Sequence, residues 1–395
     1  MSEFTQHYQS RIQMILEILH AIRNKKGVSA LNNKYKDQIQ TIIPSDIISA
    51  VHEYMQQEKN LDLIKIHINK LINLLYEPIV NFQSPQPGEN SFLAYLVRNN
   101  QQADIYLSDS KRWVKLLNEM VSESSKKELL HLYNLLLEFT EIYTIKENVI
   151  FPILENKWKD FRCIQLMWAF HDDIRRDLKE AISLLNNAMG FNIKQFNRLA
   201  GDISFRIKAI QFRDEKILFP HILDTISDED LEKMLEDARD LRFPFIQPSY
   251  DTVIGNDHNE LIVDLGTGNM SVQQLKLMIN HLPIDMTFVD ENNQVQYFST
   301  PKHRIFPRTK AIVGRNVSNC HPPDSVHIVK KIVDAFRKGE KDEASFWIRM
   351  GEKVILIRYF AVRDTENKYK GVLEVSQEIS EIQKLEGEQR LLDWE

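Results

Sequence analysis

The chain has 395 residues, of which 43% are hydrophobic and 27% are charged. This balance indicates two or three globular domains, each large enough to bury a core of its own. The formal net charge of −6 argues against a general nucleic-acid-binding protein, which usually carries a basic excess. No run of about 18 apolar residues occurs, so we expect no membrane span. The two cysteines form no disulfide or metal pattern, and we expect a cytoplasmic protein.

The first part of the chain has the pattern of a small helical domain. Apolar residues recur at helical spacing over 12–22 and again over 61–75. Pro44 interrupts the pattern and can begin a new helix. The stretch 83–90 is rich in proline and polar residues and indicates a boundary. We therefore predict a helical domain over residues 1–80.

Long helical patterns follow and predict a four-helix bundle over residues 88–240. The four helices are expected near 91–120, 125–155, 162–187 and 192–224. The bundle contains an internal repeat, because the segments Lys146–Pro152 and Asp214–Pro220 share one pattern. Each has a charged residue, a glutamate, a polar residue, two aliphatic residues and Phe-Pro. Such a repeat predicts two equivalent helices in a pseudo-symmetric bundle.

Three polar side chains fall on the apolar stripes of these helices. Helical spacing directs Glu147, His171 and Glu215 toward the interior of the bundle. Ionised carboxylates are rarely buried without a partner, and bundle interiors often assemble metal sites from Glu and His. One imidazole and two carboxylates can hold a single Zn²⁺, Fe²⁺ or Mn²⁺ with water completing the shell. The alternative is that no metal binds and that Tyr143, basic side chains or protonation satisfy the carboxylates.

Three segments of the predicted bundle resemble the last helices of bacterial hemerythrin-like (HHE cation-binding) domains. They are Tyr143–Glu155, Met167–Arg175 and Phe212–Pro220. That family holds two irons, which bind oxygen or report on redox state, and the resemblance implies Glu147, His171 and Glu215 as the corresponding ligands. Two histidines of the family are missing here, since Ile142 and the stretch 89–92 stand in their places. The resemblance thus implies a degenerate site for iron or zinc. Less specifically, the first 75 residues resemble the helical domain of unknown function that precedes such bundles.

After a linker predicted over residues 241–272, the apolar period changes from helical to alternating. Strands, a helix and further strands are then predicted in the order 284–289, 295–298, 324–338, 344–350, 353–362 and 371–377. This order of elements over residues 273–384 resembles that of a bacterial PAS domain. Segments such as Leu282–Asp290 and Arg358–Asp364 carry the same resemblance. The predicted class is therefore multidomain α and α+β, with an antiparallel PAS sheet flanked by helices and a tail at 385–395.

The resemblance to PAS domains implies a small ligand or cofactor between sheet and helices, or a sheet face that pairs with a partner. A bound haem would need an axial ligand, usually histidine. His321 in a loop is the first candidate, followed by His303 and by His327 on the helix. The alternative for His321 is a loop residue that rigidifies the turn before Pro322.

These patterns predict a sensory or regulatory protein that acts in signal transduction. The sequence has no nucleophile-elbow, zinc-protease or kinase motif, so we expect a regulator rather than an enzyme. Only a short tail follows the PAS domain. We therefore expect the signal to leave through a protein partner or through self-association of that domain. We expect neither nucleic acid nor a membrane as a partner. Two alternatives stay open: an interaction scaffold that binds no ligand, and an iron-dependent oxidoreductase that handles oxygen or nitric oxide.

Overall fold

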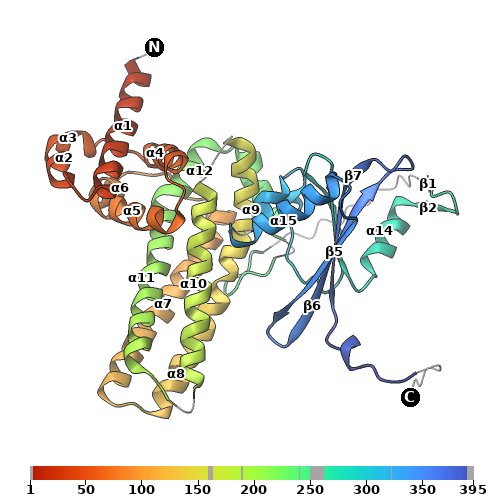
Figure 1. Cartoon of the computed structure of the whole chain (residues 1–395). Helices are drawn as coiled ribbons and strands as arrows, with labels where there is room; N and C mark the ends of the chain where they lie inside the picture. Colours follow the sequence, from red (N-terminus) through yellow and green to blue (C-terminus); the bar gives the residue numbers. More distant parts are fainter. Residues whose placement is uncertain are drawn as a thin grey trace. The chain divides into compact units, whose positions relative to one another are not determined.

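The computed structural model describes residues 3–158, 163–187, 190–239, 241–249, 262–321 and 323–388 (Figure 1). The chain separates into two compact units, Met1–Tyr250 and Asp251–Glu395. The first is built from helices and the second around an antiparallel sheet, as the predicted fold class requires. No helix in the described ranges has the length and apolar character needed to cross a membrane.

The first unit starts with short and medium helices whose ends follow from the sequence. They are α1 (Glu3–Arg23), α2 (Val28–Lys34), α3 (Lys36–Ile39), α4 (Pro44–Gln57), α5 (Leu61–Leu74) and α6 (Tyr76–Asn81). Pro44 opens α4, where its missing N–H costs no helical hydrogen bond. The Asn60 side chain caps α5 by accepting hydrogen bonds from the backbone N–H groups of Asp62 and Leu63. Arg11 in α1 pairs with the buried Asp46 of α4 at 2.6 Å and fixes the two helices together.

Longer helices follow in the same unit. They are α7 (Phe92–Glu119), α8 (Glu123–Phe139), α9 (Glu141–Lys157), α10 (Cys163–Asn186), α11 (Ile193–Arg213), the π-helical η1 (Asp214–Leu218), α12 (Phe219–Thr225) and α13 (Asp228–Asp237). Helix α7 contacts α8 and α11, and α10 contacts the same two helices, so the long helices lie side by side (Figure 1). The helix expected over 125–155 is divided at Thr140. The Thr140 hydroxyl donates a hydrogen bond to the Leu137 carbonyl and so competes with the backbone hydrogen bonds of the helix.

One hydrophobic core runs through the whole first unit, from Ile12 in α1 to Phe243 after α13. Helices α4 and α5 contact α10, and α4 and α6 contact η1. The Tyr76 ring of α6 stacks on Phe212 of α11 with 5.4 Å between ring centroids. The turn-rich stretch 83–90 therefore separates two helical segments within one unit. The division between the units falls inside the linker predicted over 241–272, of which residues 250–261 lie outside the described ranges.

The second unit contains a five-stranded antiparallel sheet in the order β4-β3-β7-β6-β5. Its strands are β3 (Asp285–Asp290), β4 (Val295–Phe298), β5 (Glu343–Met350), β6 (Lys353–Arg363) and β7 (Tyr369–Glu378). Outside the sheet lie β1 (Ile262–Asp264), β2 (Asn269–Ser271), α14 (Val272–Asn280), η2 (Lys310–Ile312), η3 (Val317–Cys320), α15 (Pro323–Arg337) and η4 (Ile382–Lys384). Val329, Val333 and Phe336 of α15 pack with sheet residues into the core of this unit.

The strand register places polar residues on the sheet face that α15 covers. Val289 of β3 pairs with Val372 of β7, and both belong to the core beneath α15. Two residues away, Thr287 pairs with Glu374, which lies opposite Tyr359 on its other side. Paired residues and alternate residues along a strand share a face. We call this set the inner-face polar patch; it consists of Asp285, Thr287, Tyr359, Glu374 and Ser376.

Gly371 at the start of this face allows two strands to approach closely. Its φ is +143°, and a Cβ at this position would lie 2.1 Å from the Val289 carbonyl oxygen. We expect Gly371→Ala to destabilise the second unit by more than about 2 kcal/mol, because both the backbone and the neighbouring strand must move. Gly351→Ala is the control, since its φ is +62° but nothing lies within 4 Å. Chemical denaturation checks the difference, and equal losses would contradict the close-approach argument.

Candidate functional site

A cluster of charged side chains lies inside the first unit, where α9, α10 and η1 meet. Lys146 has no exposed surface and Asp214 is only 2% exposed. The Lys146 ammonium donates a hydrogen bond to Asp214 Oδ2. These are the first residues of the two copies of the internal repeat, so the copies meet through opposite charges. Each buried charge thereby has a partner within the chain.

The second residue of the first copy, Glu147, contacts α10. His171 Nδ1 lies 2.7 Å from Glu147 Oε1, and the Arg175 guanidinium donates to both carboxylate oxygens at 3.1 Å. Burial raises the pKa of Glu147 to about 7, although Arg175 opposes the shift. Burial, followed by the charges of Lys146 and Arg175, holds the pKa of His171 well below its usual range. His171 is therefore a neutral imidazole at pH 7.

Aromatic rings surround His171. The Tyr143 ring stacks on the imidazole with 4.3 Å between centroids and 5° between planes, and Phe151 stacks at 6.0 Å. Within the described residues, the buried Tyr143 Oη, His171 Nε2 and Asp214 Oδ1 have no hydrogen-bond partner. Buried polar atoms almost always have such a partner, so three of them in one cluster are unusual.

The structure brings two of the three predicted metal ligands together. Glu147 and His171 are in contact, whereas Glu215 is partly exposed and accepts a hydrogen bond from the Asn100 amide at 2.8 Å. In the described part of the chain, no three His, Cys, Asp or Glu side chains lie close enough to hold a metal ion. The buried ammonium of Lys146 would also repel a metal cation. This donor set does not fit a resident metal, and metal binding by the three residues stays a prediction.

Sequence reasoning missed Lys146, Asp214 and Arg175 as members of this cluster. Lysine is almost never fully buried, so spacing arguments assign it to the surface. The available signal was the repeat itself, whose first position carries a lysine in one copy and an aspartate in the other. Opposite charges at equivalent positions of facing helices indicate an interior ion pair.

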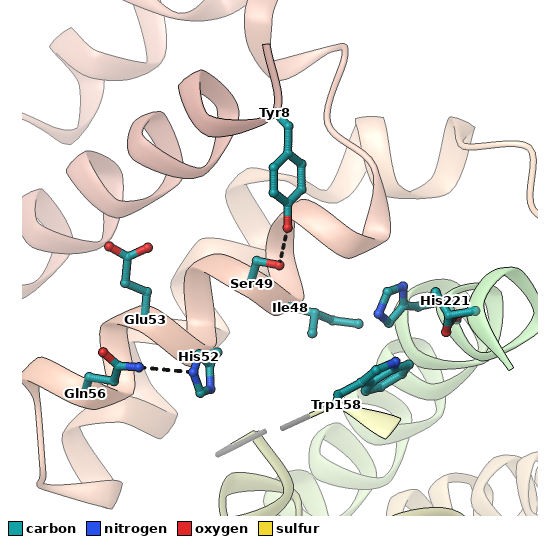
Figure 2. A pocket seen from close by; sticks show the side chains of 9 residues that line it. Tyr8, Ile48, Ser49, His52, Glu53, Gln56, Trp158 and His221 are labelled. Carbon is teal, nitrogen blue, oxygen red and sulfur yellow. Dashed lines mark hydrogen bonds between the residues drawn. The ribbon is translucent and has the colours of Figure 1, made fainter. Parts of the chain in front are cut away.

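The first unit also has an open pocket of about 620 Å³ between α4 and the ends of α9 and α12 (Figure 2). Figure 2 shows Ile48 and His52 of α4 on one side, with His221 and Trp158 opposite. The His52 and Gln56 side chains are joined by a hydrogen bond of 3.1 Å, and His221 packs on Trp158 with 4.3 Å between centroids. Burial lowers the pKa of His221, which favours its neutral form. No sequence motif marked this pocket, because its lining comes from four segments that are distant in the sequence.

In the second unit, a loop closes over one end of the inner-face polar patch. Asp285 Oδ2 accepts hydrogen bonds from the backbone N–H groups of Ile305, at 2.8 Å, and of Phe306, at 3.1 Å. Arg304 donates to the Phe306 carbonyl at 2.7 Å and to Thr287 Oγ1 at 3.4 Å. Burial lowers the pKa of Arg304 to about 10, although Asp285 opposes the shift. These contacts hold the 304–306 loop against β3.

Glu374 is the acidic centre of the inner-face polar patch. Burial raises its pKa, and the positive charges of Arg308 and Arg304 oppose that rise. Burial also raises the pKa of the neighbouring Tyr359, so its phenol stays protonated. A carboxyl, a phenol and two guanidinium groups thus adjoin a core of valine and phenylalanine side chains, an arrangement typical of ligand-binding sites.

One of the three predicted histidines belongs to this region. His321 is partly buried after η3, and burial together with the charges of Arg308 and Arg315 lowers its pKa to about 4. It is neutral at pH 7 and shares the charged neighbour Arg308 with Glu374. His303 and His327 are exposed at the surface. The structure therefore associates only His321 with the inner-face polar patch.

Comparison with known proteins agrees with this architecture. Residues 275–380 match the family model of the PAS domain. The second unit therefore contains a PAS domain. Among solved structures it is similar to a C-terminal domain from Streptococcus mutans, with 36% identity over 32% of this chain and 98% of that chain and a TM-score of 0.31.

Two further solved structures are similar to the chain. A sensory box sensor histidine kinase from Vibrio cholerae has 11% identity over 27% of this chain and 90% of that chain, with a TM-score of 0.22. The PAS domain of a protein from Colwellia psychrerythraea has 14% identity over 28% of this chain and 98% of that chain, with a TM-score of 0.23. No curated protein matches the sequence. The hemerythrin-like nature of the first unit stays a prediction.

Proposed function

We propose that this protein is a sensory regulator whose PAS domain binds a small polar ligand at the inner-face polar patch. The supporting observation is Glu374, a carboxyl group on the sheet face that α15 covers, placed between Thr287 and Tyr359. An ionisable group beside an apolar core costs folding free energy unless a partner compensates it. Its pKa shift together with two nearby arginines is typical of a functional site.

The position of Glu374 explains how a bound ligand acts on the rest of the domain. It lies on β7, the central strand, which pairs with both β3 and β6. A ligand that contacts β7 therefore acts on the strands on either side. The edge strand β5 lies next to β6 in the sheet. It carries Trp347, which is 69% exposed. Exposed tryptophan on an edge strand favours a protein partner or self-association of the PAS domain as the output.

The test is to look for a small molecule that copurifies with the full chain. Protein is denatured, the released compounds are identified by mass spectrometry, and an absorption spectrum reports any haem. We expect Glu374→Gln to lower the ligand occupancy about tenfold, because it removes a charge-assisted hydrogen bond. Glu352→Gln, in the exposed turn between β5 and β6, is the control and should retain the ligand.

Two results would contradict the proposal. Absence of any released compound and of any chromophore would favour the scaffold that binds no ligand. Equal occupancy in the Glu374→Gln and control proteins would place the ligand elsewhere. A haem spectrum that disappears in His321→Ala and persists in His327→Ala would identify the ligand as haem with His321 as its axial partner. Elemental analysis of the same samples tests the predicted iron or zinc of Glu147, His171 and Glu215.

A further inference from the structure

Arg213 is the last residue of α11, and its guanidinium group pairs with no carboxylate among the described residues. Its Nε is buried and has no hydrogen-bond partner in the described residues. Its Nη2 donates to the Asn69 side-chain oxygen, and its guanidinium carbon lies 4.4 Å from the centre of the Phe170 ring. Burial lowers its pKa to about 10, and the only charge opposing the shift is that of Asp214, which already pairs with Lys146. A partly buried guanidinium group whose buried Nε lacks an acceptor indicates a missing anion.

The other cations near Arg213 already have partners. Arg213 borders a polar cleft of about 520 Å³ between α5, α10 and α11. In that cleft the Asp173 carboxylate lies 2.8 Å from Lys65. It also lies 2.8 Å from Arg176 and 2.7 Å from Arg206. Among the described cations that line this cleft, Arg213 is therefore the one without a carboxylate partner, while the carboxylates of Asp62 and Asp202 also line it.

On its other side, Arg213 lines an apolar pocket of about 80 Å³. Aliphatic and aromatic side chains of α4, α5 and α10 form its walls, among them Ile47, Val51, Ile68, Ile72, Leu166 and Phe170. Cys163 also lines the pocket, but burial raises the pKa of its thiol to about 12, so no thiolate neutralises Arg213. The wall is completed by residues of η1, and π-helical turns often lie at functional sites.

The apolar pocket shares one lining residue with the larger pocket of Figure 2. Ile48 of α4 lines both of them, and in Figure 2 it faces His221 and Trp158. A cavity of about 150 Å³ holds benzene, so the apolar pocket alone accepts only a few carbon atoms.

We propose that the first unit binds an aliphatic carboxylate, with the carboxylate on Arg213 and the tail in the apolar pocket. The planar guanidinium matches a carboxylate through parallel hydrogen bonds, which an alcohol or amine cannot form. The tail removes apolar surface from water at the walls of α4, α5 and α10. Because α4 and α5 belong to the N-terminal segment and α10 to the later one, such a ligand joins the two segments of the unit.

The test measures binding of acetate, butyrate, hexanoate and octanoate to the full chain by titration calorimetry at fixed ionic strength, with 1-hexanol as the uncharged control. We expect affinity to rise about fourfold with each buried methylene group and to level off once the pocket is filled. Hexanol should bind at least about tenfold more weakly than hexanoate. Equal affinity for acetate and octanoate, or for hexanoate and hexanol, would overturn the proposal.

Variants distinguish this site from general adsorption. Arg213→Met should weaken hexanoate binding at least about tenfold and raise the melting temperature of the ligand-free protein, because it removes an uncompensated buried cation. Arg206→Met is the matched control: it should lower the melting temperature, since it breaks the pair with Asp173, and leave hexanoate binding unchanged. If Arg213→Met fails to fold, Arg213→Lys is the second variant. It keeps the positive charge but lacks the two parallel N–H donors of guanidinium, so it should also weaken hexanoate binding. Unchanged affinity in the folded Arg213 variant would contradict the proposal.

Discussion

Replacing Lys146 with leucine should lower the free energy of unfolding of the first unit by about 3 kcal/mol or more. The substitution leaves Asp214, which is 2% exposed, without its ammonium partner, and an unpaired buried charge is strongly destabilising. Protonation of Asp214 relieves part of this cost, because burial already raises its pKa. Urea denaturation at pH 8 measures the loss, which should shrink as the pH is lowered toward 5.

Two double variants separate the ion pair from the packing around it. Lys146→Leu with Asp214→Leu removes both charges and should recover most of the loss, or exceed the stability of the natural protein. Lys146→Asp with Asp214→Lys exchanges the charges between the repeat copies and should also be more stable than either single variant. A double leucine variant that is as unstable as Lys146→Leu alone would show that packing, rather than charge pairing, governs this position.

The contribution of Glu147 to the free energy of unfolding should fall as the pH rises from about 5 to about 7. The pKa of Glu147 is about 7 in the folded protein, above its ordinary value of 4.5, so the folded state holds this proton more tightly than the unfolded chain. Stability is therefore highest at low pH for this group and decreases through the window between the two values. The decrease amounts to about 3 kcal/mol for a fully buried carboxyl group. The difference in free energy of unfolding between the natural protein and Glu147→Gln, followed across this pH range by chemical denaturation, measures it.

Glu147→Gln should remove this slope, because glutamine does not titrate. Glu141→Gln, an exposed change on the same helix, should leave the slope intact. Arg175, His171 and Lys146 face Glu147. Burial holds the pKa of His171 well below its ordinary value of 6.5, so the contribution of His171 to stability rises with pH in the same window and opposes that of Glu147. This contribution is common to the natural protein and Glu147→Gln, and it cancels when the two are compared. Equal slopes for the natural protein and Glu147→Gln would mean that Arg175 holds Glu147 ionised throughout this window.

Much of the PAS domain follows from the local sequence. The hairpin expected at 284–289 and 295–298 corresponds to Asp285–Asp290 and Val295–Phe298, and the helix expected at 324–338 to Pro323–Arg337. Alternating apolar residues and turn residues specify these elements locally. The residues that fold over the inner face could not be placed in this way, because Arg304 and His321 come from irregular loops whose position depends on tertiary contacts.

The helical unit shows where spacing arguments fail. Glu147 and Glu215 occupy equivalent positions of the repeat, yet one contacts His171 of α10 and the other Asn100 of α7. The reason lies in η1: a π-helical turn contains more residues than an α-helical turn and rotates the side chains that follow α11. The surroundings of Arg213 could not be predicted from the sequence either, because its neighbours Asn69 and Phe170 are distant in the chain.

The contact between the two repeat copies has a consequence for symmetry. Two identical segments that meet at the same position would bring a residue against its own copy, so lysine would face lysine and aspartate would face aspartate. Attraction at that position requires the copies to differ. Lys146 and Asp214 supply this difference, which a chain with two covalently linked copies can encode and an assembly of two identical chains cannot.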